Sequence, residues 1–320
     1  MRAWYRGARW LWLLWPLSLL FALISHLRRQ LFALGLKRVY RAPVPVLVVG
    51  NLTVGGNGKT PVVVWLVEWL RAQGYRPGVI SRGYGGKSEQ YPLVLNDNTP
   101  AAQAGDEPVL IYRRTGCPVV VGPGRADAAA RLAALGVDII ISDDGLQHYA
   151  LARDLELVVV DGQRRFGNGR LLPMGPLREG KWRLNSVDAV INNGGPVQSG
   201  EYLMTLAPGE LRPVSGEGKT PASGTTVHAL AGIGHPPRFF NTLQGLGFIL
   251  DKQIALADHE PMRPAELVSL ADKPLLITEK DAVKWSGGHD DCWYLPVQAC
   301  LPVEFEQMLS KRLKELNHGN

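Results

Sequence analysis

Cysteine is scarce in this chain. Three cysteines occur among 320 residues, at Cys117, Cys292 and Cys300, with no CxxC pair and no spacing typical of zinc ligands. This scarcity excludes a disulfide-stabilised scaffold and fits a reducing compartment. Internal repeats and low-complexity tracts are also missing. The length and the hydrophobic content of 46% therefore predict two ordinary globular domains.

Acidic residues are absent from residues 1–41, where eight Lys or Arg side chains give a charge of +8. The rest of the chain has 27 basic and 29 acidic residues, so its charge is −2. The formal net charge of +6 therefore belongs to the N-terminus. A basic groove across the body of the protein is excluded, and we expect no nucleic-acid partner.

Charged residues are also missing from residues 10–27. As a helix this run would be about 27 Å long, just short of the ~30 Å hydrocarbon core of a bilayer. Trp10, Trp12 and Trp15 lie in this segment and Trp4 precedes it, and Trp favours the headgroup level. No convincing signal-peptide cleavage site follows at residues 25–29.

Three arrangements remain open for this segment: a single span, a helix lying in the membrane interface, and a helix packed on the protein's own core. An interfacial or partly inserted arrangement is favoured for this apolar helix, which cations flank on both sides. The same cations predict that the body of the protein is cytosolic. Residues 1–41 are therefore expected to form a membrane anchor.

A glycine-rich loop with the sequence GNLTVGGNGKT occupies residues 50–60, between a strand-like run and a helix-like run. Such a loop turns backbone N–H groups toward a phosphate chain, so it predicts binding of a nucleoside triphosphate. Lys59 would reach the β- and γ-phosphates, and the Thr60 hydroxyl would hold Mg²⁺. Thr53 stands where the general pattern has glycine, and the alternative is a plain turn with a surface lysine. The predicted nucleotide-binding residues are Thr53, Val54, Gly55, Gly56, Asn57, Gly58, Lys59 and Thr60.

Strand-like and helix-like runs alternate along the rest of the chain. This alternation predicts an α/β fold, with a parallel sheet of the P-loop NTPase type flanked by helices and with its sites at the carboxyl ends of the strands. A Gly/Pro/Ser-rich stretch at 208–223 separates a second α/β unit. The predicted division is an anchor at 1–41, a P-loop domain at 42–215 and a smaller C-terminal domain at 216–320.

Several charged residues follow predicted strands. Asp143 and Asp144 come after an apolar strand, where NTPases place the carboxylate that holds Mg²⁺, although Asp-Asp-Gly also forms turns. Asp161 is a weaker rival for the metal. Arg82 and Arg125 suit an anionic substrate or the migrating phosphoryl group, or they are solvated loop cations.

Three further residues are ambiguous on their own. Asp106 begins a predicted helix, where an acid is either a cap or a base that takes a proton from an acceptor hydroxyl. His259, beside Asp258, and His148, beside Gln147, have no pattern that decides between structural and chemical roles.

Together these segments resemble the tetraacyldisaccharide 4′-kinase family of lipid A synthesis. The similarity runs in the family's order over almost the whole chain, and the family shares Thr53. The matching segments are GNLTVGGNGKTP (50–61), SRGYGG (81–86), GDEP (105–108), VGPGR (121–125), SDDGLQH (142–148), FGNGRLLPMGPLRE (166–179), AGIGHPPRFF (231–240), DHE (258–260) and TEKDAVK (278–284).

The resemblance implies a kinase at the cytoplasmic face of the bacterial inner membrane, attached through residues 1–30. It would transfer the γ-phosphate of ATP, with Mg²⁺, to the 4′-hydroxyl of a tetraacyl glucosamine disaccharide 1-phosphate. By motif, Asp106 is the acceptor base and His259 its partner, while Asp143 and Asp144 position metal and phosphate. Lys59 completes the implied catalytic group. The implied substrate contacts are Arg82, Arg125, Gln147, His148 and Asn168.

The sequence departs from the family where Leu146 replaces a bulkier aromatic, and the alignment around His259 is less secure. The alternative function is a membrane-docked P-loop ATPase or GTPase switch that acts on a protein partner. A GTPase would need an Asn/Thr-Lys-x-Asp motif to read guanine. Here residues 278–281 read TEKD, which places the lysine one position too late.

Overall fold

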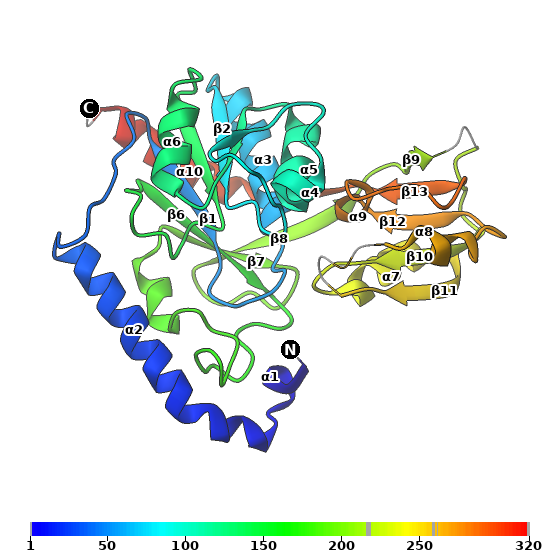
Figure 1. Ribbon diagram of the computed structural model, residues 1–320, viewed down its shortest axis with the longest axis horizontal. Helices are drawn as coiled ribbons and strands as arrows, with labels where there is room; N and C mark the ends of the chain where they lie inside the picture. Colours follow the sequence, from blue (N-terminus) through cyan, green and yellow to red (C-terminus); the bar gives the residue numbers. More distant parts are fainter. Residues whose placement is uncertain (1, 216–218, 258–259, 261, 319–320) are drawn as a thin grey trace.

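The computed structural model describes residues 2–215, 219–257, 260 and 262–318. Its strands form a nine-stranded and a five-stranded sheet. Figure 1 shows the larger sheet with its helices on the left and the smaller sheet projecting to the right. This arrangement, with an apolar N-terminal helix beside the larger sheet, confirms the predicted fold class.

The larger sheet has the strand order β14-β8-β7-β6-β1-β5-β2-β4-β3. The strands from β8 to β4 are parallel, whereas β14 and β3 pair antiparallel at the two edges. The bounds are β1 Val46–Gly50, β2 Pro77–Ser81, β3 Leu93–Val94, β4 Val119–Val121, β5 Ile139–Asp143, β6 Leu155–Asp161, β7 Ala189–Asn193, β8 Glu201–Pro208 and β14 Val297–Cys300.

Both faces of this sheet are covered, which explains why its central strands are continuous apolar runs. Leu47 and Val49 of β1 face a core shared with α3 (Lys59–Ala72), α5 (Asp106–Thr115) and α10 (Val303–His318). Val46 and Val48 face the opposite core, which includes residues of α6 (Arg125–Ala133). The period of two in β1 thus sends alternate side chains to two separate helical layers. Two short helices, α4 (Ala101–Ala104) and η2 (Lys181–Ser186), lie in its connections.

The smaller sheet has the order β11-β10-β12-β13-β9, and all of its pairs are parallel except that of β9 with β13. Phe239, Phe240 and Leu243 of α7 pack on one core of this sheet. The bounds are β9 Arg212–Ser215, β10 Thr226–Ala231, α7 Pro236–Gly245, β11 Ile249–Ala255, α8 Pro264–Val268, β12 Leu275–Thr278, α9 Glu279–Ala282 and β13 Cys292–Leu295.

The chain passes between the two sheets twice. It leaves the larger sheet after β8 and returns at β14, and α10 then packs on the larger sheet through Phe305. The Phe305 ring lies 5.6 Å from that of Trp65 and 5.2 Å from that of Tyr202. Sheet membership therefore differs from the predicted division at residue 216, because β9 already belongs to the smaller sheet and residues 297–318 do not. Amino-acid composition indicates an irregular segment, but it does not show which of the two sheets β9 or β14 joins.

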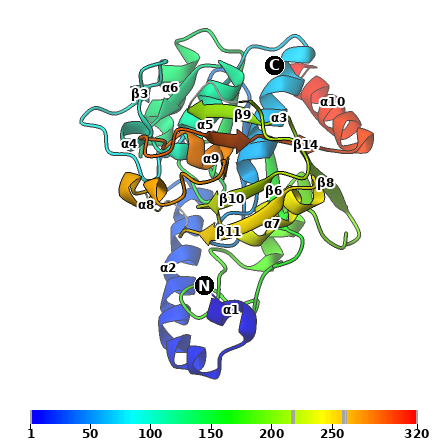
Figure 2. The same cartoon turned by 90° about the vertical axis from the view of Figure 1, so that its right-hand side faces the viewer.

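The N-terminal helices project beyond both sheets (Figures 1 and 2). They are α1 (Arg2–Arg6), the 3₁₀ helix η1 (Arg9–Leu14) and α2 (Trp15–Ala33). Residues 9–33 are long and apolar enough to cross a membrane: an 18-residue window within them has a mean hydropathy of 1.7, and only 11% of that window is buried. Helix α2 is therefore not a core helix of the described fold, which removes one of the three arrangements left open by the sequence.

Candidate active site

The glycine-rich loop joins β1 to α3, which begins at Lys59. Gly58 precedes the helix with φ +87°, and a Cβ there would lie 2.1 Å from the side-chain nitrogen of Asn193. Glycine is therefore the residue that fits this position. The first free N–H groups of α3 follow directly, and a helix N-terminus of this kind favours anions.

Thr53 has a structural role that explains its departure from the general pattern. Its side chain is buried, and its hydroxyl oxygen accepts a hydrogen bond of 2.8 Å from Asn57 Nδ2. Asn51 Nδ2 donates to the main-chain oxygen of Thr53 over 2.7 Å. The loop is thus cross-linked by its own side chains, and a glycine at position 53 would lose the bond to Asn57.

Lys59 lies beside two oxygen atoms at the carboxyl ends of the strands. Its ammonium nitrogen is 3.3 Å from Asn51 Oδ1 and 3.4 Å from Asp144 Oδ1. Arg178 also holds Asp144, since its Nη1 is 3.1 and 3.0 Å from the two carboxylate oxygens. Burial acts to raise the pKa of Asp144, but Lys59 and Arg178 outweigh it and keep the pKa well below its ordinary value. Asp144 is therefore a stable anion between two cations.

Asp143 is a different kind of carboxylate. It is the last residue of β5, is 1% exposed, and accepts a hydrogen bond of 3.1 Å from Ser81 Oγ. Burial, with repulsion from Glu107, raises the pKa of Asp143 to about 7. Its Oδ1 has no hydrogen-bond partner among the described residues. A buried carboxylate oxygen without a partner fits a cation ligand, and oxygen is the ligand type that Mg²⁺ prefers.

Asp106 is the first residue of α5 and is 8% exposed. The ammonium group of Lys284, which follows α9, lies 3.8 Å from its carboxylate. Beside it, Lys280 of α9 pairs with Glu107 over 3.0 Å. The start of α5 thus faces the smaller sheet. His259 lies outside the described residues, as does Asp258, so the Asp106–His259 pair stays a prediction.

The other predicted substrate residues are divided between two places. Arg125 is 3% exposed, and its Nη2 donates to the main-chain oxygen of Asp143 over 2.7 Å, while burial lowers its pKa to about 10. Burial, together with Arg125, lowers the pKa of His148 to about 4, so the imidazole is neutral at pH 7. Gln147 Nε2 donates to Asn51 O over 3.3 Å, and Arg82 is exposed. These four residues surround the carboxyl ends of β1 and β5.

Asn168 lies instead in the loop beneath the N-terminal helices. Its Nδ2 donates to Met174 O over 2.9 Å, and its Oδ1 accepts from Arg170 N over 3.1 Å. Trp4 Nε1 donates to Pro173 O of the same loop over 3.1 Å. The described contacts thus give Asn168 a part in shaping the loop, and its contact with substrate stays a prediction.

A cavity of about 400 Å³ lies between the glycine-rich loop and the smaller sheet. Gly56 to Pro61 form one wall, and α7 with the loop at residues 233–235 forms the opposite one. Val64, Leu110 and Phe239 give it an apolar interior. A space of this size, apolar with a polar loop at its edge, is typical of small-molecule sites.

Sequence reasoning missed four residues around this loop: Arg164, Arg178, Asn193 and Arg238. Arg178 lies in the segment 166–179 that resembles the family. The sequence therefore identified the motif that contains Arg178, but it did not indicate the contact of Arg178 with Asp144. The Asn-Asn-Gly-Gly run at residues 192–195, at the end of β7, was the signal for Asn193.

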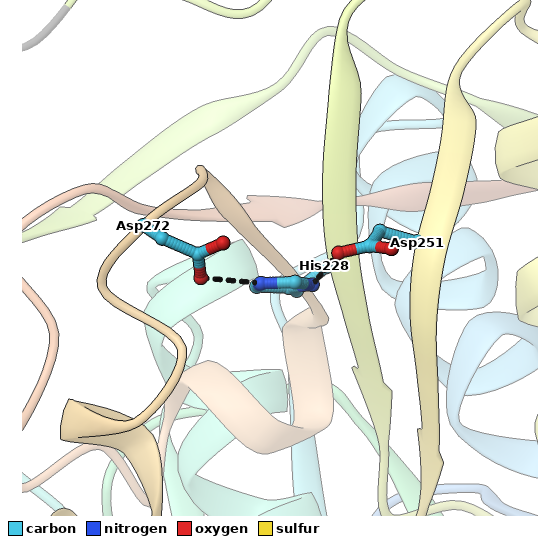
Figure 3. A group of neighbouring side chains, drawn as sticks. All are labelled: His228, Asp251 and Asp272. Atoms are coloured by element: carbon cyan, nitrogen blue, oxygen red, sulfur yellow. Dashed lines mark hydrogen bonds and ion pairs between the residues drawn. The ribbon is translucent and has the colours of Figure 1, made fainter.

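A second polar cluster lies in the smaller sheet (Figure 3). The buried His228 ring has Nε2 2.9 Å from Asp272 Oδ1 and Nδ1 3.6 Å from Asp251 Oδ2. Lys273 Nζ lies 3.0 Å from Asp251 and 2.6 Å from Asp272. The three groups could hold a metal by composition, but the two nitrogens face different carboxylates, and the Lys273 ammonium group already pairs with both carboxylates. The cluster therefore fits an ion-pair network that joins β10 to β11.

Comparisons with known proteins agree with the geometry. Residues 10–314 match the family model described as tetraacyldisaccharide-1-P 4′-kinase. The tetraacyldisaccharide 4′-kinase of Aeromonas hydrophila subsp. hydrophila is 61% identical over 317 residues, covering 98% of this chain and 95% of the relative. That of Tolumonas auensis is 55% identical over 321 residues, covering 99% and 98%.

The fold has a solved counterpart. The crystal structure of LpxK from Aquifex aeolicus in complex with ATP has a TM-score of 0.75 and 26% identity, covering 93% of this chain and 98% of its own. These relatives give no support to the alternative of a nucleotide switch. A match over nearly the whole chain and relatives more than half identical confirm the resemblance seen in the motifs: this chain belongs to the tetraacyldisaccharide-1-P 4′-kinase family.

Proposed function

We propose that this protein transfers the γ-phosphate of ATP to the 4′-hydroxyl of a tetraacyl glucosamine disaccharide 1-phosphate, a step of lipid A synthesis. The observation that carries the proposal is the position of Lys59, in a phosphate-type loop at the edge of the cavity, in a chain of this family. Asn51 Oδ1 and Asp144 Oδ1 bind the ammonium group where phosphate oxygens of ATP would bind it.

Mg²⁺ belongs to the proposal as the partner of ATP. Thr60 and Asp143 are the residues that would hold it, and the partnerless, buried Oδ1 of Asp143 supports this assignment. When bound, the ion would neutralise charge on the phosphate oxygens. It would also keep Asp143 ionised at neutral pH, because a nearby cation lowers the pKa of a carboxyl.

Asp106 is proposed to take the proton of the acceptor hydroxyl, with His259 as its partner. The acceptor is a weakly acidic alcohol, so a carboxylate helps only at hydrogen-bond distance. Asp106 lies at the start of α5, near Lys280 and Lys284 of the smaller unit, and so at the junction of the two sheets. Arg82, Arg125, Gln147, His148 and Asn168 are proposed to contact the substrate.

The acyl chains of the acceptor require a site at the bilayer. Helix α2 exposes a row of apolar side chains, and cations flank it. We propose that residues 1–30 hold the enzyme at the cytoplasmic face of the inner membrane. The unit built on the smaller sheet, with strands β9 to β13, is proposed to close the cleft against the P-loop domain.

Transfer of labelled phosphate tests the proposal. The protein in detergent is given γ-labelled ATP, Mg²⁺ and a tetraacyl disaccharide 1-phosphate, with Lys59→Ala as the control. Label in the lipid with the unmutated protein alone supports the proposal. Free phosphate without labelled lipid would overturn it and favour an ATPase that acts on a protein partner.

A further inference from the structure

Two successive carbonyl groups of the phosphate loop are held by side chains from elsewhere in the fold. Asn193 Nδ2, at the end of β7, donates to Asn57 O over 2.9 Å. Arg164, which follows β6, donates through Nη2 to Gly56 O. Asn193 is 3% exposed, so its bond is shielded from water.

Holding these oxygens fixes the neighbouring N–H groups. The peptide unit is planar and trans, so the N–H of a residue points opposite to the carbonyl that precedes it. A bond to Asn57 O therefore sets the direction of the Gly58 N–H, and a bond to Gly56 O sets that of the Asn57 N–H. Gly58 has φ +87°, and glycine is free to rotate, so this peptide is the one that most needs an external restraint.

Both restraining side chains also bind the smaller sheet. Arg238 of α7 donates through Nη1 to Asn193 Oδ1 over 3.0 Å and through Nη2 to Asn193 O over 3.1 Å. Arg164 Nη1 donates to Gly234 O over 3.3 Å. Gly234 packs directly on the loop, because a Cβ there would lie 2.8 Å from Gly56 N.

Arg238 determines which end of the Asn193 amide faces the loop. A guanidinium group only donates hydrogen bonds, so the amide must turn its oxygen toward Arg238. The amide nitrogen is then left facing Asn57 O, which needs a donor. Without Arg238 the amide could rotate and lose the loop contact. The orientation of the loop peptide thus depends on whether α7 is in place.

We propose that Asn193 and Arg238 are positioning residues for phosphate binding: Arg238 orients Asn193, and Asn193 keeps the Gly58 N–H directed at the phosphates of ATP. The proposal rests on the proposed function only in that the loop binds ATP. Contact between the smaller sheet and the larger one is thereby linked to the affinity of the loop for phosphate. Arg164, held by Asp161 over 2.9 Å, supplies the second link.

Four variants test the relay: Asn193→Asp, Asn193→Ala, Arg238→Met and the double variant Asn193→Ala with Arg238→Met. The probes are ATP and adenosine, whose dissociation constants are measured without lipid. Asn193→Asp keeps the shape and the bond to Arg238 but points a carboxylate at Asn57 O. We expect ATP binding to weaken about tenfold or more, whereas adenosine binding changes less than twofold, because adenosine has no phosphate.

The double variant separates the relay from a direct contact, since Arg238 also lines the cavity. If Arg238 acts through Asn193, then Arg238→Met weakens ATP binding in the unmutated protein but not in Asn193→Ala. An equal effect in both backgrounds would overturn the relay and make Arg238 a nucleotide contact. ATP affinity within twofold of the original in Asn193→Asp would overturn the role of Asn193.

Two controls complete the design. Arg76→Met removes an exposed arginine that pairs only with Asp138 among the described residues, and it should leave ATP binding unchanged. Thermal melting of every variant shows whether it is folded. If an Asn193 variant fails to fold, ATP binding can still be measured in Arg238→Met, because the Arg238 side chain is only half-buried. An unmutated protein that binds no ATP would refute the proposed function instead, which distinguishes the two failures.

Discussion

Three exposed leucines of α2 allow a quantitative test of membrane attachment. Leu20, Leu23 and Leu27 are 53%, 64% and 56% exposed, and their spacing places them on one face of the helix. Full burial of a leucine gives about 1.5–3 kcal/mol, so burial of a little over half gives roughly 1–1.7 kcal/mol each. The three together contribute about 3–5 kcal/mol to membrane binding, or at least about a hundredfold in the partition constant.

The perturbation is the triple variant Leu20→Gln, Leu23→Gln and Leu27→Gln, since glutamine keeps a high helix propensity. Its binding to phospholipid vesicles is measured by co-sedimentation over a range of lipid concentrations. We expect the partition constant to fall by about a hundredfold or more. A protein released from vesicles should still melt cooperatively, because these side chains lie outside the described cores.

A matched triple variant replaces exposed apolar side chains elsewhere with glutamine: Leu135→Gln, Val268→Gln and Val303→Gln, at 40%, 62% and 61% exposure. It should bind vesicles as the unmutated protein does. A partition constant of the α2 variant within threefold of the original would refute the reasoning and show that another surface binds lipid. Equal loss in both variants would point to a general effect of surface polarity.

Three other predictions concern single groups. Asp106→Asn should lower kcat by about 10²–10⁴ with little change in the KM for ATP, and a change in KM alone would make Asp106 a binding residue. In the native protein a thiol reagent should modify Cys300, which is exposed, and spare Cys117 and Cys292, whose pKa values are raised by burial; early modification of all three would contradict this. The pKa of His148 is lowered by burial to about 4, so the unfolded chain binds a proton between pH 6.5 and 4 that the folded one does not, and acid destabilises the fold. The free energy of unfolding, measured in urea, should therefore fall less between pH 7 and pH 5 in His148→Gln than in the unmutated protein. An equal fall in both proteins would refute the lowered pKa of His148.

Local patterns predicted the core of the fold well. Apolar runs located the central strands because a strand buried on both faces is largely apolar, as in β1 and in the three isoleucines that begin β5. The glycine-rich loop was predictable for a similar reason, since the chemistry of phosphate binding acts over a few adjacent residues. The sequence pointed to both Asp143 and Asp144, but it did not show that burial raises the pKa of Asp143 whereas Lys59 and Arg178 lower that of Asp144. Ser81, Arg125 and Arg178 approach them from distant parts of the chain, and the sequence does not give those distances.

Long-range contacts explain what the sequence left out. Asn193 lies more than 130 positions from the loop residue that it holds, and Arg238 a further 45. The local sequence around Asn193 does not indicate its contact with the phosphate loop or with Arg238. The strand β14 is a four-residue run after a tight connection, and its pairing with β8 follows from topology alone. The role of Asp106 depends on a partner, His259, that lies outside the described residues.

The return of the chain to the larger sheet has a consequence for synthesis. A ribosome makes β14 and α10 only after the whole of the smaller sheet, and domains fold as they emerge. Until then Trp65 and Tyr202 have no Phe305 to cover them, and the edge of β8 has no neighbour on that side. The larger unit is therefore incomplete during most of its own translation. A nascent chain stopped near residue 295 would expose aromatic surface and an open strand edge, the two features that chaperones recognise and that drive aggregation.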